Sequence, residues 1–307
     1  MRSVHEFLKT APFDIYELHL FQLVAEHRSF TKAAEVAGLT QSAVTRQMQG
    51  IEASLGVTLF ERTTRSVRPT AAGEMLLSES RRLLGNVQHT LQRIREEFAD
   101  AKKEIRVGLS RSIGLAHLPG FFHANLRRAP GVGYRVRSAA STDILSALES
   151  NDLDLGILCP PVRLPRTVQV RHSFADAFTL IGSADAAGPA FAATPKRARL
   201  AWAAQQPWLL LDESSNSGRQ LRSWLQQQGL TVEPAMNLDG VDLIINLVAL
   251  GLGVGFVPTR ALALYPHKHS IKRLPWPARF SRELVVVVRR NRELPPHLSR
   301  FVENVLF

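Results

Sequence analysis

The chain has 307 residues and a net charge of +11, and its length fits two or three domains rather than one ordinary core. Its 45% hydrophobic and 21% charged residues are typical of a globular protein, and no apolar run approaches the roughly 18 residues of a membrane span. The charge supports an anionic partner only weakly, because residues 1–104 carry 14 Lys and Arg against 13 Asp and Glu, whereas the remainder carries 24 against 14.

The single cysteine, Cys159, excludes an internal disulfide and is interpreted as a buried residue near a hinge. Residues 1–12 mix charged side chains into short apolar stretches, which is not the pattern of a signal peptide. On both grounds a reducing, cytoplasmic location is expected.

Two short helices are predicted near the start of the chain. Apolar residues recur at helical spacing from Leu18 to Val24. Ser29-Phe30-Thr31 is a helix-start signal for a second helix over residues 32–37. Gly38 can adopt the left-handed conformation of a tight turn, so the chain is ready to start another helix directly afterwards.

The third predicted helix runs from Gln41 to Leu55, with Thr40 as its cap and Gly56 as its stop. Together with the preceding helix it forms a helix-turn-helix. One face is predicted to be a buried stripe of Val44, Met48, Ile51 and Leu55. The opposite face could bond base edges or phosphates through Ser42, Thr45, Arg46 and Gln49. An ordinary amphipathic surface helix would show the same pattern.

A basic hairpin is predicted after this helix. Val57–Phe60 is a short strand, and arginines follow at three-residue steps before Pro69-Thr70. These arginines are Arg62, Arg65 and Arg68. A basic hairpin beside a recognition helix suits a minor groove or a phosphate backbone, so the segment favours DNA binding.

In this order and spacing, the segments resemble the LysR-type transcriptional regulators. The resemblance is carried by Ser29-Phe30-Thr31-Lys32-Ala33-Ala34, Leu39-Thr40-Gln41-Ser42-Ala43-Val44-Thr45-Arg46-Gln47-Met48, Ile51-Glu52, Leu55-Gly56-Val57, Leu59-Phe60-Glu61-Arg62 and Pro69-Thr70-Ala71-Ala72-Gly73. It implies a winged helix-turn-helix domain over residues 1–73 that binds double-stranded promoter DNA. Ser42 stands where a proline is frequent and Pro69 where a leucine is frequent, so base preference is in doubt. The expected DNA-binding residues are Thr31, Gln41, Ser42, Thr45, Arg46, Gln49, Arg62 and Arg65.

A long linker helix is predicted over residues 71–103, with Thr70 as its cap. Heptad spacing predicts a dimerisation seam of Leu77, Leu84, Val87, Leu91, Ile94 and Phe98. The alternative is a helix packed on its own chain. The resemblance also implies dimerisation through this helix, and the sequence leaves dimer and tetramer open.

Residues 105–307 alternate between predicted strands and helices, which is typical of an α/β domain with a largely parallel sheet. The predicted strands are 105–109, 134–138, 153–158, 208–211, 254–257 and 284–288, and the helices are 115–128, 144–149, 221–227 and 241–250. The resemblance implies a two-lobed, periplasmic-binding-protein-like (type 2) effector domain. We expect crossings near Pro160 and Pro258, with lobe one at 105–160 and 259–307 and lobe two at 161–258.

Polar residues follow predicted strands and precede helices, where ligands bind in such sheets. The candidates for effector binding are Ser110, Arg111, Ser112, Ser141, Thr142, Ser214 and Asn216. Helix capping is the alternative role for each hydroxyl. Arg111 suggests a carboxylate or phosphate as the effector.

No motif of an enzyme is found, because the sequence lacks a nucleophile elbow, a metalloprotease motif and a phosphate-binding loop in the right context. Gly251–Gly255 is interpreted as a tight turn, and His267 and His269 as solvated side chains, so neither a cofactor nor a metal is expected. An exported solute-binding protein would leave the helix-turn-helix unexplained. The expected partners are promoter DNA, a small-molecule effector, a second copy of the chain and RNA polymerase, with no membrane.

Overall fold

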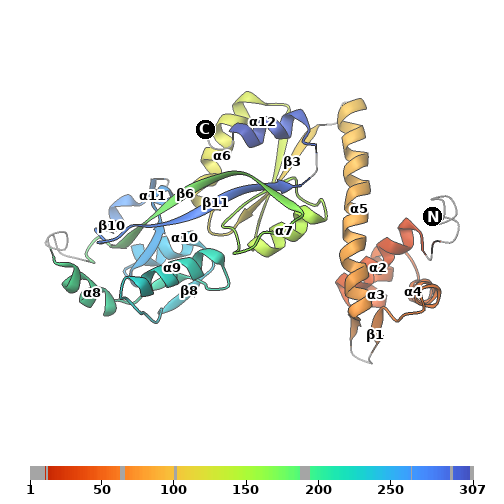
Figure 1. Ribbon diagram of the computed structural model, residues 1–307, viewed down its shortest axis with the longest axis horizontal. Coiled ribbons are helices and arrows are strands. Elements are labelled where there is room, and N and C mark those ends of the chain that lie inside the picture. The colour runs from red at the N-terminus through yellow and green to blue at the C-terminus, as the bar shows by residue number, and fades with distance from the viewer. Residues whose placement is uncertain are drawn as a thin grey trace. The chain divides into compact units, whose positions relative to one another are not determined.

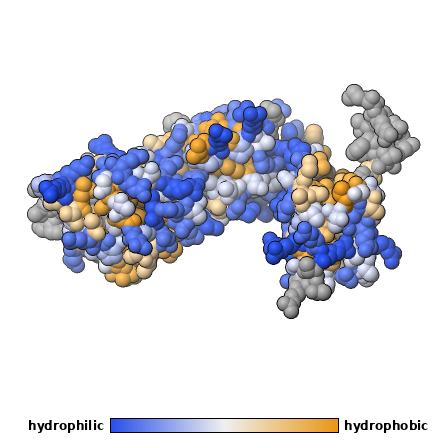
Figure 2. Space-filling model, turned by 60° about the horizontal axis from the view of Figure 1, so that its bottom comes forward, coloured by the Kyte–Doolittle hydropathy of each residue, from blue (hydrophilic) through white to orange (hydrophobic). Residues whose placement is uncertain are grey.

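The computed structural model describes residues 11, 13–62, 66–99, 102–186, 194–263, 265–290 and 293–304. The chain divides into two compact units, residues 1–99 and 100–307. Hydrophilic residues cover most of the face drawn in Figure 2, and hydrophobic residues form separate patches on it. Among the described residues, no helix is long and apolar enough to cross a membrane.

The first unit is a helical domain with a small hairpin and one long helix (Figure 1). Its elements are α2 (Ile15–His27), α3 (Phe30–Ala37), α4 (Gln41–Leu55), β1 (Phe60–Arg62), β2 (Val67–Pro69) and α5 (Ala71–Phe98). Strands β1 and β2 pair antiparallel. The helix-turn-helix followed by a β-hairpin is therefore present, as the sequence predicted.

Caps define the ends of these helices as physical chemistry requires. The Asp14 carboxylate accepts a hydrogen bond from the Glu17 backbone N–H, and the Glu17 carboxylate accepts one from the Asp14 backbone N–H. These two bonds form a capping box that starts α2. Thr40 caps α4 and Gly56, at φ 68°, ends it, so the prediction for this helix is confirmed. The left-handed turn at Gly38 links α3 to α4.

The core of the first unit joins all three short helices to the hairpin. Its centre is aromatic, with the rings of Phe21 and Phe30 packed against Phe60. The predicted stripe on α4 is buried except at Leu55, which is 38% exposed because the helix ends there and the chain turns away. The prediction for Leu55 was therefore wrong.

Helix α5 begins at Ala71, after the Thr70 cap, and continues for 28 residues, about 42 Å at 1.5 Å per residue. It ends at Phe98 rather than at residue 103, because Lys103 already starts the first strand of the second unit. Leu77 packs into the core of the first unit. Its assignment to the seam was therefore wrong.

The second unit is built on a seven-stranded sheet in the order β10-β6-β11-β5-β3-β4, with β9 paired to β6. Its strands are β3 (Lys103–Ser110), β4 (Val132–Ala139), β5 (Leu155–Leu158), β6 (Val168–Ser183), β7 (Leu209–Leu211), β8 (Met236–Leu238), β9 (Gly255–Pro258), β10 (Ile271–Leu274) and β11 (Phe280–Arg289). Its helices are α6 (Gly114–Arg128), α7 (Ser141–Glu149), α8 (Lys196–Ala204), α9 (Asn216–Gln227), α10 (Val241–Ala249), α11 (Thr259–Ala263), the 3-10 turn η2 (Lys268–Ser270) and α12 (Pro296–Asn304).

The sheet is mixed rather than largely parallel. Among the described strands of this seven-stranded sheet, only β3 pairs in parallel, with β4 and β5, whereas β11, β9 and β10 pair antiparallel with β6. The expected parallel pairing was therefore wrong for the predicted strands 254–257 and 284–288, whereas 208–211 pairs in parallel with β8 in a separate two-stranded sheet. The long strands β6 and β11 run side by side from one end of the unit to the other (Figure 1).

Two lobes share these long strands, and the crossings lie inside them. Phe174 and Leu284 pack on the core beside β3 and β5, which we call lobe one. Phe178 and Phe280 belong to the core around α9 and α10, which we call lobe two. The chain therefore crosses at about residue 176 in β6 and returns at about residue 282 in β11. The crossings predicted near Pro160 and Pro258 were wrong. Strand β6, which spans both lobes, was not predicted from the sequence.

Candidate DNA-reading surface and effector cavity

The polar face of α4 is available to a ligand. Gln41, Ser42, Arg46 and Gln49 are exposed, and so is Thr31 on α3. Thr45 is half-buried, and its hydroxyl accepts a hydrogen bond from Gln41 Nε2 at 3.1 Å. The side chains predicted to contact DNA on these two helices are thus polar and at least partly accessible, and none of them is acidic.

Glu52, for which the sequence predicted no role, fixes the hairpin to α4. Its Oε1 accepts hydrogen bonds from the backbone N–H groups of Leu59 and Phe60, at 2.8 and 3.2 Å. Its Oε2 accepts one from Arg62 Nη2 at 3.1 Å. The Arg62 guanidinium also lies 4.7 Å from the ring centre of Phe30. Arg62 is thus held against the domain itself, although a third of its side chain remains exposed.

The remaining wing residues are placed only in part. Arg65 lies outside the described residues. Arg68 is exposed on β2 and faces Glu61 across the hairpin. The hairpin therefore presents at least one arginine that the first unit leaves open to solvent.

The C-terminal half of α5 carries an apolar stripe at heptad spacing. Leu84 is half-buried, and the other four members are between 39% and 78% exposed: Val87, Leu91, Ile94 and Phe98. Such a row of exposed large apolar side chains on one helix is costly in water unless another surface covers it.

A cavity of about 160 Å³ lies between the lobes of the second unit. All seven residues predicted for effector binding line it: Ser110, Arg111, Ser112, Ser141, Thr142, Ser214 and Asn216. The rule that ligands bind at the carboxyl ends of strands therefore predicted correctly that the lobe-one residues lie together. Further lining residues come from lobe two and were not predicted from the sequence, among them Asp212, Ser217 and Asp239.

Hydrogen bonds join the lobes around this cavity. The Cys159 carbonyl oxygen at the end of β5 accepts bonds from Asn216 Nδ2 at 2.9 Å and from Ser141 Oγ at 3.4 Å. At the rim, exposed Arg111 pairs with exposed Asp239 at 3.4 Å. Cys159 itself is buried, and burial raises the pKa of its thiol. The predicted ligand-binding groups thus hold the two lobes together.

Two polar side chains of the cavity, Asp212 and Ser110, differ in whether they have a hydrogen-bond partner. Asp212 accepts a hydrogen bond from the Ser214 backbone N–H at 2.7 Å, and bonds from Ser214 lower the pKa of this carboxyl. Ser110 Oγ is buried and has no hydrogen-bond partner among the described residues. A polar atom left in that condition costs free energy, so the cavity holds a group that a ligand could satisfy.

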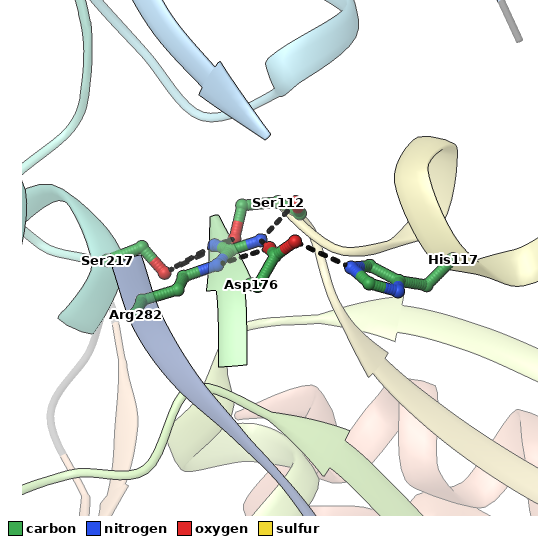
Figure 3. Close-up of polar contacts among 5 residues, drawn as sticks. All are labelled: Ser112, His117, Asp176, Ser217 and Arg282. Carbon is green, nitrogen blue, oxygen red and sulfur yellow. Dashed lines mark hydrogen bonds and ion pairs between the residues drawn. The ribbon is translucent and has the colours of Figure 1, made fainter. Parts of the chain in front are cut away.

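Beneath the cavity lies a buried cluster of charged and polar side chains (Figure 3). Arg282 of β11 and Asp176 of β6 are directly opposed in the antiparallel ladder, at the crossings between the lobes. Arg282 Nε and Nη2 both lie 2.9 Å from Asp176 Oδ2. Nη1 donates at 2.6 Å to the hydroxyls of Ser112 and Ser217, and Nη2 donates to the Ser112 carbonyl. Every nitrogen of this fully buried guanidinium has a partner.

His117 completes the cluster from α6. Its Nε2 lies 2.9 Å from Asp176 Oδ1, and both side chains are buried. Burial alone would raise the pKa of Asp176, but the hydrogen bond from His117 and the charge of Arg282 outweigh it and lower the pKa. Because ionised Asp176 only accepts, His117 donates through Nε2, which leaves its buried Nδ1 without a described partner.

Comparison with known families settles what kind of protein carries these features. The family model described as "LysR substrate binding domain" matches residues 99–306. The model described as "Bacterial regulatory helix-turn-helix protein, lysR family" matches residues 15–74. The chain belongs to the LysR family. It is a DNA-binding transcriptional regulator with an effector-binding domain, and the family is one of regulators rather than enzymes.

Curated LysR-family relatives align with nearly the whole chain. The "RuBisCO operon transcriptional regulator" of Allochromatium vinosum is 28% identical over 299 residues, which cover 94% of both chains. A regulator of Shigella flexneri described as "Uncharacterized HTH-type transcriptional regulator YfeR" is 27% identical over 284 residues, 92% of this chain and 90% of its own.

Solved LysR structures share the fold. Full-length CbnR in complex with its target DNA has a TM-score of 0.70 and 23% identity, covering 96% of this chain and 99% of that one. A full-length OxyR variant from Pseudomonas aeruginosa has a TM-score of 0.69 and 21% identity, covering 95% and 94%. Within the described residues of this regulator, no group of His, Cys, Asp and Glu side chains could hold a metal ion.

Proposed function

We propose that this LysR-family regulator reads promoter DNA with the polar surface of α3 and α4 and with the arginines of its hairpin. The observation that supports this is a set of polar, non-acidic side chains on the two helices, all exposed except the half-buried Thr45: Thr31, Gln41, Ser42, Thr45, Arg46 and Gln49. Arg62 and Arg65 add phosphate contacts at the wing, with Arg62 already oriented by Glu52. Pre-oriented donors lose less conformational entropy when DNA binds.

The regulator acts as a dimer whose seam is the exposed stripe of α5. Burying these apolar side chains against a second copy removes them from water, which stabilises the pair by about 25 cal/mol per Å². Two readers related by a two-fold axis then meet an inverted repeat in DNA. The stripe itself, Val87, Leu91, Ile94 and Phe98, is what supports this proposal.

A small molecule with a carboxylate or phosphate group occupies the cavity and changes the affinity of the dimer for its promoter. The single observation that carries this part is that seven predicted polar residues, drawn from both lobes, line one cavity. A ligand held by both lobes favours one lobe arrangement over another. Its effect on DNA binding is limited by its difference in affinity for the two arrangements.

The reader is tested by selecting genomic fragments that bind the full chain and measuring affinity by fluorescence anisotropy. Arg46→Ala is expected to weaken binding by about 1–3 kcal/mol, and a contact to phosphate alone also reduces the salt slope by about one. Arg137→Ala, an exposed arginine on β4 of the other unit, serves as the control. Equal affinities for parent and Arg46→Ala would contradict the assignment.

The cavity is tested by a calorimetric screen of carboxylates and phosphates against the full chain. A compound that shifts promoter affinity is expected to bind Thr142→Val and Arg111→Ala more weakly than the parent protein. Unchanged binding in both variants would place the effector site elsewhere.

A further inference from the structure

Two hydroxyls on the floor of the cavity share one buried cation. Ser112 comes from lobe one and Ser217 from lobe two, and both line the cavity. Their oxygens lie 3.4 Å apart, and Arg282 Nη1 donates to both at 2.6 Å (Figure 3). Because a guanidinium has donors but no acceptor, both hydroxyl oxygens act as acceptors toward it. Their own protons are therefore directed away from Arg282.

Accepting a bond from a cation makes each hydroxyl a better donor, because hydrogen bonds in a chain polarise one another. The two hydroxyls can also bond to each other, and either of them can be the donor. When Ser217 donates to Ser112, the proton of Ser112 is left for a ligand. Ser110 Oγ, also on the cavity wall, is buried without a partner. The floor thus offers two groups to a ligand, the free proton of one cluster hydroxyl and the Ser110 hydroxyl.

The charge of the cluster is oriented. Asp176 pairs with Nε and Nη2 of the guanidinium, so the negative end of the cluster lies at these two nitrogens (Figure 3). The positive end, Nη1, faces the hydroxyls. Buried and screened from water, such a dipole acts strongly on a charge placed above it. Of the two carboxylates of the cavity, Asp239 is paired with the charge of Arg111, and Asp212, which stays ionised, accepts from the Ser214 backbone N–H.

Arg282 is also fixed with respect to both lobes. It stands opposite Asp176 in the ladder of the two crossover strands, and its guanidinium lies 5.0 Å from the ring centre of Phe178. A group at this position stays with the hinge while Ser112 follows lobe one and Ser217 follows lobe two. Arg282 Nη1 therefore links a hydroxyl of each lobe in the arrangement described.

We propose that Arg282 is the specificity-determining residue of the cavity: through Ser112 and Ser217 it selects a ligand with an anionic oxygen over its neutral isostere. This rests on the proposed function of the cavity as the effector site. The ligand oxygen accepts from the Ser112 hydroxyl on the floor, and Arg282 acts through that hydroxyl without touching the ligand.

The test uses acetate and acetamide, which have the same shape and differ in charge. Each is titrated into the full chain at constant ionic strength, and unfolding is followed by tryptophan emission. All four tryptophans lie in lobe two: Trp202, Trp208, Trp224 and Trp276. We expect acetate to raise the unfolding midpoint and to bind at least about tenfold more tightly than acetamide, the ratio that one charge-assisted hydrogen bond supplies.

Three variants separate specificity from stability. Arg282→Met and Ser112→Ala should bring the acetate-to-acetamide ratio to about one. Arg106→Met is the matched control, because Arg106 makes a similar pair with Asp154, at 3.0 and 3.2 Å, and does not line the cavity. It should lower stability and leave the ratio intact. If Arg282→Met does not fold, Ser112→Ala carries the comparison.

A parent protein that binds acetate and acetamide equally, or an Arg282→Met or Ser112→Ala variant that keeps the full preference, would overturn the proposal. Promoter affinity is measured on the same preparations with the compounds from the calorimetric screen. A screened compound that still shifts promoter affinity then supports the effector site while the role of Arg282 is rejected. If no compound shifts it, the proposed function itself fails.

Discussion

Replacing Glu52 with alanine should loosen the hairpin of the DNA-reading unit more than any change to its arginine partner. The carboxylate accepts from the backbone N–H groups of Leu59 and Phe60 and from Arg62, and only 15% of its side chain is exposed. Leu59 and Phe60 are themselves 1% exposed, so their N–H groups have little water to replace the lost acceptor.

The magnitude follows from these contacts. Each N–H left without an acceptor costs about 1–3 kcal/mol, and partial access of water reduces the two together to about 2–4 kcal/mol. The ion pair with Arg62 adds less than about 1 kcal/mol, because a third of the arginine is in solvent. Glu52→Gln keeps an oxygen for the backbone and should cost about 1 kcal/mol, as should Arg62→Met.

Hydrogen exchange followed by mass spectrometry measures this locally in the full chain. For the peptide that contains residues 57–62, Glu52→Ala should reduce protection about 30- to 700-fold, the equivalent of 2–4 kcal/mol. Glu52→Gln and Arg62→Met should each reduce it less than about tenfold. If Glu52→Ala and Arg62→Met reduce protection equally, the carboxylate serves the arginine and not the backbone, and the reasoning is refuted.

Three further predictions concern the rest of the molecule. Gly73→Ala should destabilise the first unit by about 1–3 kcal/mol, because a Cβ there would overlap a backbone oxygen, whereas Gly50→Ala meets nothing within 4 Å and should stabilise it by about 1 kcal/mol in urea unfolding. Changing Leu91 and Ile94 to aspartate should convert dimers to monomers in sedimentation velocity, and a fully dimeric double variant would exclude the seam. Because the pKa of Asp176 is lowered below its usual 3.8 in the folded state, its contribution to stability is present above that value and is lost as the pH falls through the lower, folded pKa. Tryptophan emission should therefore show acid unfolding below about pH 4 that Asp176→Asn makes less steep, and an unchanged slope would count against the cluster.

Local signals in the sequence predicted the first unit well. The boundaries of α4 follow from Thr40 and Gly56, whose capping roles depend only on neighbouring residues. Leu77 could not be assigned correctly by the same means, because a heptad position does not say whether a leucine meets its own domain or a second chain. The apolar stripe beyond it has the predicted spacing, and the identity of the surface that covers it stays a proposal.

In the second unit, the cavity residues could be predicted from the rule that ligands bind at the carboxyl ends of strands, whereas the buried cluster around Arg282 and Asp176 could not. Ser112 was placed at the cavity by its position after a strand, but its bond to a residue 170 positions away lies beyond any local pattern. A signal was nevertheless present. Asp176 alternates with Phe174 and Phe178 on an inward face, and Arg282 alternates with Phe280 and Leu284. Each segment therefore has one charged residue between two inward-facing apolar residues, and the two charges are opposite. This pattern indicates two strands that pair through a buried ion pair.

The place of β11 in the sheet sets the order in which the molecule can be completed on the ribosome. Lobe one starts at Lys103, yet β11, which begins at Phe280, lies between β5 and β6 at the centre of its sheet. Until that strand leaves the exit tunnel, β5 and β6 expose unpaired edges and Asp176 has no buried cation. All of lobe two is synthesised in this interval. A nascent chain stalled shortly before Phe280 should therefore be a target for chaperones, because unpaired edges and long-range contacts both favour misassembly.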